Sequence, residues 1–109
     1  MIHNLKIQKK YADAICGGVK TFEIRKEDDK HFEIGDVITF YVVDLNAYHR
    51  IEEMAYFVPY VIRHSDFPDG IPEGSCVFSI VPLGDELGHY YTKDMVEEQV
   101  LLVHILVLS

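Results

Sequence analysis

The sequence has few of the residues that mark disulfide-linked or metal-binding proteins. Its 109 residues include two cysteines, Cys16 and Cys76, which lie far apart and in no C-x-x-C spacing. We therefore expect neither a disulfide framework nor a zinc knuckle, and two buried or spare thiols instead. The six histidines show neither H-x-x-x-H nor Cys–His spacing, so we expect no metal site and no cofactor.

Long apolar runs are also lacking. The longest, VLLVHILVL at 100–108, is interrupted by His104 and suits a buried strand better than a membrane span. The N-terminal MIHNLKIQKK has no apolar signal core, which predicts a cytoplasmic protein. With 49% hydrophobic and 26% charged residues, the chain has the composition and length of a single folded domain over 1–109.

Positive charge is scarce and unevenly distributed. Residues 1–30 hold seven Lys and Arg against five acids, a sum of +2, and residues 31–109 hold three against thirteen, a sum of −10. The formal net charge of −8 argues against a general polyanion-binding protein but leaves room for a small basic site near the N-terminus. A different class of function also fits: an interaction domain whose acidic surface docks a basic partner or mimics nucleic acid.

Hydrophobic periodicity and turn residues predict a small α+β domain. A helix is expected over 8–16, ended by Gly17 and Gly18, and a short helical turn over 93–98. Strands are expected over 2–7, 20–26, 37–43, 50–63, 75–83 and 99–108. Pro59 implies an edge position or a bulge in its strand. About five to six mostly antiparallel strands would then curl into a barrel around one principal N-terminal helix, and the 99–108 strand could pair with a second copy to give a homodimer.

The stretch GGVKTFEIRK crowds four charged side chains into seven positions: Lys20, Glu23, Arg25 and Lys26. Alternation places Phe22 and Ile24 on one face of a strand and Glu23 and Arg25 on the other. Lys20 offers a point charge, Arg25 a planar two-pronged donor and Glu23 an acceptor, which together suit a ligand site. The same alternation equally fits a solvated strand face with ordinary surface ion pairs.

Two motifs in the first 43 residues carry a resemblance to a known family. They are G-x-K-x-x-E-x-R, at Gly18, Lys20, Glu23 and Arg25, and F-x-x-G-D, at Phe32, Gly35 and Asp36. Together they resemble the ASCH superfamily of PUA-like β-barrels, and within it an uncharacterised branch found in bacteria and phages. The resemblance covers 1–43 well and 56–82 more loosely, whereas 83–109 has no counterpart and forms a C-terminal extension of the same domain.

The resemblance implies a PUA-like barrel whose cleft, between helix and sheet, binds single-stranded RNA or a nucleotide. The ligand-binding residues would be Lys6, Lys20, Glu23, Arg25, Lys26 and Arg63, with Asp66 as a further rim contact. Phosphate contacts would hold the ligand, Glu23 would add selectivity, and Phe32 or Tyr11 could stack on an unpaired base. Gly35 and Asp36 would be structural and shape the turn that closes the cleft.

An enzymatic branch of the same superfamily, similar in this segment, is an amidohydrolase of N4-acetylcytidine. Its motif has a lysine, a threonine three residues later and a glutamate further on. Here Lys20 matches the lysine, but Glu23 stands in place of the threonine nucleophile, and Thr21 directly follows Lys20. A carboxylate substitutes poorly for a hydroxyl nucleophile, although Glu23 beside Lys20 could act as a general base on water. Lys20 and Glu23 are therefore the catalytic candidates if the protein is a hydrolase of a modified nucleoside.

Overall fold

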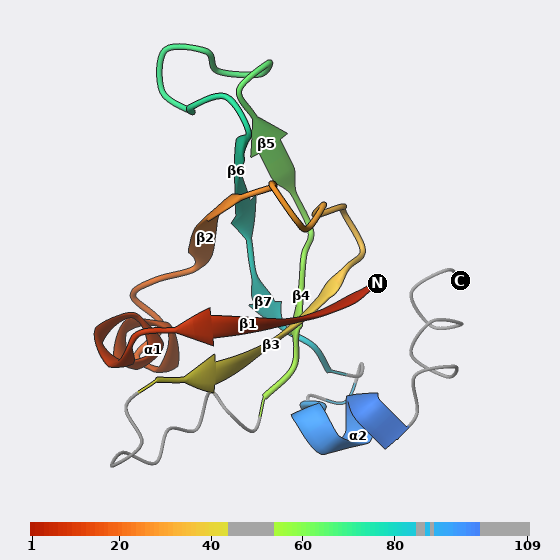
Figure 1. The fold of residues 1–109 in the computed structure, drawn as a ribbon. Helices are drawn as coiled ribbons and strands as arrows, with labels where there is room; N and C mark the ends of the chain where they lie inside the picture. Colours follow the sequence, from red (N-terminus) through yellow and green to blue (C-terminus); the bar gives the residue numbers. More distant parts are fainter. Residues whose placement is uncertain (44–53, 85–86, 88, 99–109) are drawn as a thin grey trace.

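A computed structural model of the chain describes residues 1–43, 54–84, 87 and 89–98. The elements in this part are β1 (Ile2–Ile7), α1 (Lys9–Cys16), β2 (Phe22–Lys26), β3 (Val37–Val42), β4 (Tyr56–Phe57), β5 (Val61–Arg63), β6 (Ser75–Ser79), β7 (Val81–Pro82) and α2 (Lys93–Glu98) (Figure 1). Both predicted helices and the strands expected over 2–7 and 37–43 are confirmed. The strand expected over 99–108 lies outside the described residues.

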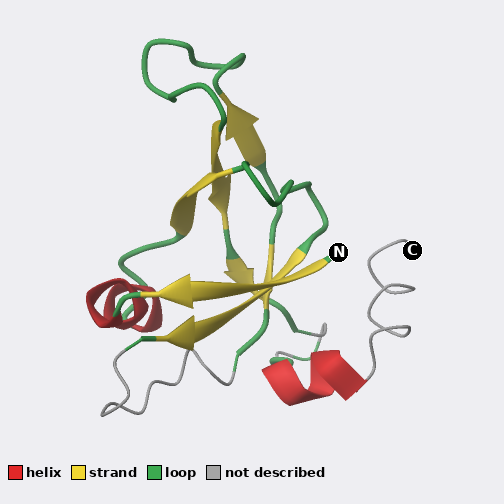
Figure 2. Ribbon diagram, viewed as in Figure 1, coloured by secondary structure: helices red, strands yellow, loops and turns green. Residues whose placement is uncertain are grey.

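The strands form two sheets, one mixed and one antiparallel (Figure 2). In the sheet β1-β3-β4-β7, β1 and β3 run parallel, with Ile2 opposite Val37 and Ile7 opposite Val42. The other sheet, β2-β6-β5, is antiparallel throughout. This is the expected small, mostly β domain. Because the described strands close no continuous hydrogen-bonded barrel, the barrel stays a prediction.

Two segments expected as single strands each pass from one sheet to the other. The strand expected over 50–63 is divided into β4 and β5, and the strand expected over 75–83 into β6 and β7. Pro59 lies in the first break, where its missing N–H would interrupt a ladder. Val58, in the same break, still bonds to the segment before β3: its N–H donates to the Asp36 carbonyl at 3.0 Å, and its own carbonyl accepts from Gly35 N–H at 2.9 Å.

The core lies between the sheets and α1. Its largest members, such as Phe32, Phe40 and Phe78, are almost fully buried. The Phe32 ring stacks on Phe78, with centroids 4.7 Å apart, and lies 4.6 Å from the His3 ring. Phe32 therefore cannot stack on a nucleobase, and that expectation from the sequence is wrong.

The Gly35–Asp36 turn is structural, as expected, but it lies at the starts of β1 and β3 and, in the part of the chain that the structure describes, closes no cleft. Gly35 adopts a φ of 95°, a left-handed conformation that glycine takes without strain. The Asp36 carboxylate accepts hydrogen bonds from the Met1 ammonium at 3.0 Å, His3 Nε2 at 2.8 Å and Glu33 N–H at 2.9 Å. This turn thereby fixes the start of β3 against the start of β1. Within the described residues, no helix is long and apolar enough to cross a membrane.

Candidate ligand pocket

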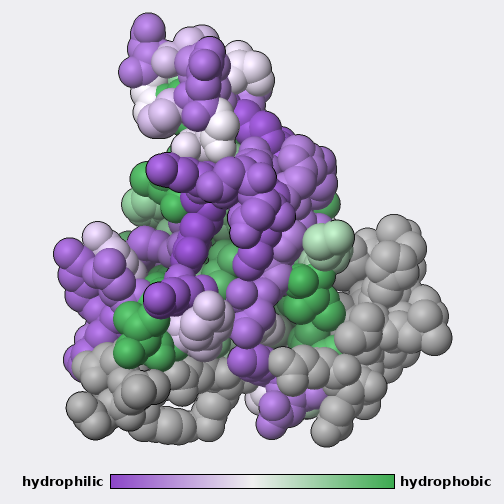
Figure 3. Space-filling view, viewed as in Figure 1, coloured by the Kyte–Doolittle hydropathy of each residue, from purple (hydrophilic) through white to green (hydrophobic). Residues whose placement is uncertain are grey.

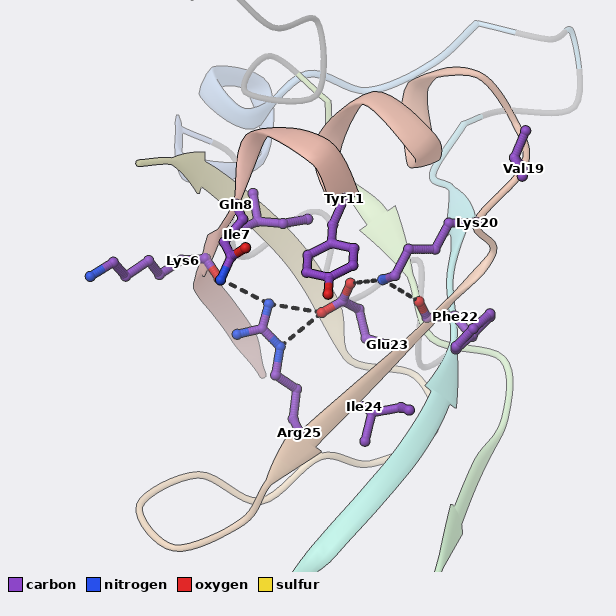
Figure 4. A pocket seen from close by; sticks show the side chains of 10 residues that line it. All are labelled: Lys6, Ile7, Gln8, Tyr11, Val19, Lys20, Phe22, Glu23, Ile24 and Arg25. Atoms are coloured by element: carbon purple, nitrogen blue, oxygen red, sulfur yellow. Dashed lines mark hydrogen bonds and ion pairs between the residues drawn. The ribbon is translucent and has the colours of Figure 1, made fainter. Parts of the chain in front are cut away.

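A pocket of about 610 Å³ opens between α1, the end of β1 and the strand β2 (Figure 4). The residues that line it are Lys6, Ile7, Gln8, Tyr11, Val19, Lys20, Phe22, Glu23, Ile24 and Arg25. The G-x-K-x-x-E-x-R element thus forms one wall, and the first turn of α1 forms another. Charged and aromatic side chains lie together in this pocket.

Glu23 lies at the centre of a charged network that also contains Lys20 and Arg25. Its side chain is only 5% exposed because Glu23 pairs with Phe78 on β6 and faces inward. Lys20 Nζ donates to Glu23 Oε1, and Arg25 Nε donates to Glu23 Oε2 at 2.8 Å. The interpretation of this motif as a solvated strand face with surface ion pairs is therefore wrong.

The two cations are also tied to backbone carbonyls. Lys20 Nζ donates to the Phe22 carbonyl at 2.6 Å, and Arg25 Nη2 donates to the Lys6 carbonyl at 3.0 Å, which links β2 to β1. An ammonium has three N–H donors and a guanidinium has five, so these contacts leave donors on both side chains for a ligand. Two cations and one carboxylate give the charged network a formal charge of +1, although the protein as a whole is acidic.

Aromatic rings lie on two sides of the Lys20 ammonium. Lys20 Nζ is 5.7 Å from the centroid of the Tyr11 ring and 5.4 Å from that of Phe22. Both rings are partly exposed and line the pocket, so they offer apolar faces next to a positive charge. The sequence suggested Tyr11 as a stacking ring but did not suggest Phe22.

The other predicted ligand residues are placed differently. The exposed Lys6 side chain extends away from the charged network, and only its carbonyl contacts Arg25 (Figure 4). Lys26 lies on the opposite face of β2 from Glu23. Arg63 binds the Glu27 carboxylate, with Nε at 2.8 Å, and its N–H donates to Asp66 Oδ2 at 2.8 Å. The structure therefore does not bring the side chains of Lys6, Lys26 and Arg63 into the charged network.

Among the residues that line the pocket with Lys20 and Glu23, none is a serine, threonine or cysteine. Thr21 lines a second hollow, of about 220 Å³, on the other side of Lys20, and is not among the residues of the larger pocket. Both oxygens of Glu23 already accept hydrogen bonds from cations. Cys16 and Cys76 are free thiols, and among the described residues no group of three or more His, Cys, Asp or Glu side chains could hold a metal ion.

Comparisons with known proteins give a family and a fold. Residues 2–80 match the model of DUF3850, a domain of unknown function. No curated protein matches the sequence. One similar solved structure is that of hypothetical protein PH0355, with a TM-score of 0.52 and 16% identity, covering 76% of this chain and 100% of that chain. Another is a mutant of ZmASCH from Zymomonas mobilis, with a TM-score of 0.53 and 14% identity, covering 89% of this chain and 78% of that chain. At these identities the likeness shows the fold alone, which is ASCH-like.

Proposed function

We propose that this chain, which belongs to the DUF3850 family, binds a nucleotide or an unpaired segment of RNA in the pocket between α1 and β2. The observation that carries the proposal is the charged network at one wall of the pocket, bordered by aromatic rings. Lys20 and Arg25 would donate to phosphate oxygens, and the rings of Tyr11 and Phe22 would pack on a base. The ASCH-like fold is consistent with such a module.

Within this proposal, Glu23 holds the two cations in place. Its carboxylate lies between Lys20 and Arg25 and bonds to both, so it offsets the repulsion that two neighbouring positive charges would otherwise feel. A ligand phosphate would meet donors that are already oriented, which reduces the entropy lost on binding. This role differs from the direct, selective contact with the ligand that the sequence suggested for Glu23.

The two alternative functions have less support. A hydrolase would need a nucleophile or a free base, but Thr21 lines the other hollow and both Glu23 oxygens are engaged. An acidic docking surface stays a prediction, because two of the acids that would test it, Glu52 and Glu53, lie outside the described residues. The bacterial and phage branch, the cytoplasmic location and the homodimer also stay predictions.

A backbone-amide NMR titration with each of the four nucleoside monophosphates, and then with a short single-stranded RNA pool, tests the proposal. The structure supplies a matched pair of variants, because Arg25 and Lys26 are neighbours that face opposite sides of β2. We expect Arg25→Gln to weaken binding roughly tenfold, since a charge-assisted hydrogen bond to phosphate is lost. Lys26→Gln removes the same charge from the opposite face and is expected to change mononucleotide affinity only slightly.

The position of the shifts and the salt dependence complete the test. Shifts should cluster on residues 6–25, and binding should weaken as salt rises, because phosphate contacts are electrostatic. A flat titration of a folded protein would overturn the proposal. Equal losses in Arg25→Gln and Lys26→Gln would mean that overall charge, and not this pocket, attracts the ligand.

A further inference from the structure

The outward side of the antiparallel sheet β2-β6-β5 carries several apolar side chains. Residues paired across the strands share a side, so Phe22 accompanies Ser79, and Ile24 accompanies Val77 and Ile62. Tyr60 continues the row of Ser79, whose N–H donates to the Tyr60 carbonyl at 3.1 Å. We call this surface the outer face, defined by Phe22, Ile24, Tyr60, Ile62, Val77 and Ser79.

The outer face is open to solvent where its apolar side chains are largest. Ile24 is 62% exposed, Tyr60 59% and Phe22 44%, whereas the inward partners Cys76 and Phe78 are buried. Figure 3 shows hydrophobic atoms at the molecular surface beside β2. Exposed apolar residues scattered singly need no explanation, but a group of them on one sheet face marks an interaction surface.

The outer face is continuous with the pocket. Phe22 and Ile24 belong to the outer face through their strand register, and both also line the pocket. A ligand that extends out of the pocket past these two side chains therefore reaches Val77 and then the far strand β5. This continuity favours a chain-like ligand of which one unit occupies the pocket.

The charge of the outer face favours a polyanion over a basic protein partner. At the outward positions of β2, β5 and β6, the charged side chain is Lys26, which pairs with Ser75, and none is acidic. A phosphate backbone meets no acidic side chain at these strand positions, and a basic peptide finds no acidic partner there.

We propose that single-stranded RNA, with one nucleotide in the pocket and its base on Phe22, continues across the outer face and stacks a second unpaired base on Tyr60. This inference rests on the proposed function and extends it from a single nucleotide to a strand. Phe22 lies on β2 and Tyr60 directly precedes β5, and these two strands flank β6, so the two backbones are separated by two strand spacings, about 10 Å. That separation suits two different bases, one on each ring, as on other sheet surfaces that stack unpaired bases.

The test measures how affinity depends on RNA length in the wild type and in two tyrosine variants. Fluorescence anisotropy would give the affinity for random-sequence single-stranded RNA of one, two, four and eight nucleotides. We expect affinity to rise with length in the wild type, and Tyr60→Ala to remove most of the rise, roughly a tenfold loss for the octamer. Mononucleotide affinity should not change, because Tyr60 is not among the pocket residues. Tyr41, which is 44% exposed on β3 in the other sheet, supplies the control variant Tyr41→Ala.

Three results would overturn the inference, and they separate it from the proposed function. If mononucleotides bind and longer RNA binds no more tightly, the outer face takes no part in binding and the pocket proposal is unaffected. If the folded protein binds RNA of no length, both proposals are wrong. If Tyr60→Ala keeps the length dependence but converts a dimer to a monomer in light scattering, the outer face is a contact between two copies. Binding of the octamer alone, weakened by Tyr60→Ala, would support the outer face and contradict the pocket.

Discussion

Arg63 and Glu27 form a two-pronged ion pair although they are 36 residues apart: Arg63 Nε donates to Glu27 Oε1 at 2.8 Å, and Nη2 donates to Oε2 at 3.1 Å. The Glu27 side chain is 10% exposed, and it also accepts from Phe32 N–H at 2.9 Å. Arg63 Nη2 donates to the Phe32 carbonyl as well. The pair therefore fastens the 27–32 segment to β5.

Replacing Arg63 with methionine should destabilise the fold without affecting the pocket. Arg63→Met removes both Arg63 hydrogen bonds from the Glu27 carboxylate, whose side chain is only 10% exposed. We expect the free energy of unfolding to fall by roughly 1–3 kcal/mol, the cost of a buried acceptor that loses its partner. Urea denaturation measures this loss, and nucleotide affinity below the unfolding transition should stay as in the wild type.

Lys26→Met is the control, because Lys26 is exposed and lies at the end of β2. Its free energy of unfolding should stay within about 0.5 kcal/mol of the wild type. Unchanged stability together with weaker nucleotide binding in Arg63→Met would contradict our assignment. It would return Arg63 to the ligand site that the sequence predicted.

Acid should weaken the fold through Glu27 and Asp36. Burial alone would raise the pKa of each carboxyl. Hydrogen bonds outweigh it: the one from Arg63 helps to lower the pKa of Glu27, and the one from Glu33 N–H helps to lower the pKa of Asp36. Between the lowered pKa values and the ordinary ones, 4.5 and 3.8, the folded protein binds fewer protons than the unfolded chain. The stabilisation is therefore complete above these ordinary values and is lost as pH falls through the lowered ones.

Thermal unfolding at pH 7, 5, 4 and 3 checks this dependence. We expect the Tm to change little between pH 7 and 5 and to fall progressively below pH 4.5, the ordinary value for Glu27. In Arg63→Met the Tm should decrease less with falling pH, because the variant lacks the interaction that lowers the pKa of Glu27. A Tm that holds constant down to pH 3 would contradict the assignment of both carboxyl groups.

Local patterns in the sequence predicted most of the helices and strands and part of the pocket lining. Gly17 and Gly18 mark the end of α1, and Pro59 marks the break between β4 and β5. Alternation correctly placed Glu23 and Arg25 on one side of β2. It could not show that this side faces inward, because that depends on pairing with β6 and on cations that accompany the carboxylate.

Contacts between distant segments account for what the sequence could not predict. Glu27 and Arg63 belong to different elements, and no local spacing indicates that they meet. The strand expected over 20–26 begins at Phe22, so Lys20 enters the pocket from the preceding loop. The clue that was available is the placement of Glu23 between two cations of the same motif, which is how a buried carboxylate is usually neutralised.

Tyr11 and Phe32 should behave in opposite ways when each is replaced with alanine. Tyr11 is 41% exposed and lines the pocket, so Tyr11→Ala should weaken nucleotide binding roughly tenfold and leave the urea midpoint nearly unchanged. Phe32 is 1% exposed, and Phe32→Ala should cost about 3–5 kcal/mol of unfolding free energy. Isothermal titration and urea denaturation of both variants separate the two roles. A stable Phe32→Ala that loses binding would return Phe32 to the ligand site.

Glu23→Gln distinguishes a carboxylate that positions cations from one that contacts a base. The substitution keeps the side-chain shape but raises the formal charge of the network from +1 to +2. We expect the free energy of unfolding to fall by roughly 1–3 kcal/mol, because Lys20 and Arg25 then face each other without an anion. Binding of nucleoside monophosphates should become more sensitive to salt, since the phosphate meets more positive charge.

Titrations of all four nucleoside monophosphates at low and high salt measure both effects. If Glu23 positions the cations, the ranking of the four nucleotides stays the same in Glu23→Gln, and only the salt dependence changes. If Glu23 instead accepts a hydrogen bond from a base edge, the favoured nucleotide loses affinity more than the others. Incubation with N4-acetylcytidine provides a separate readout, in which we expect no acetate release. Turnover by the wild type that stops in both Lys20→Ala and Glu23→Gln would assign the pocket to a hydrolase.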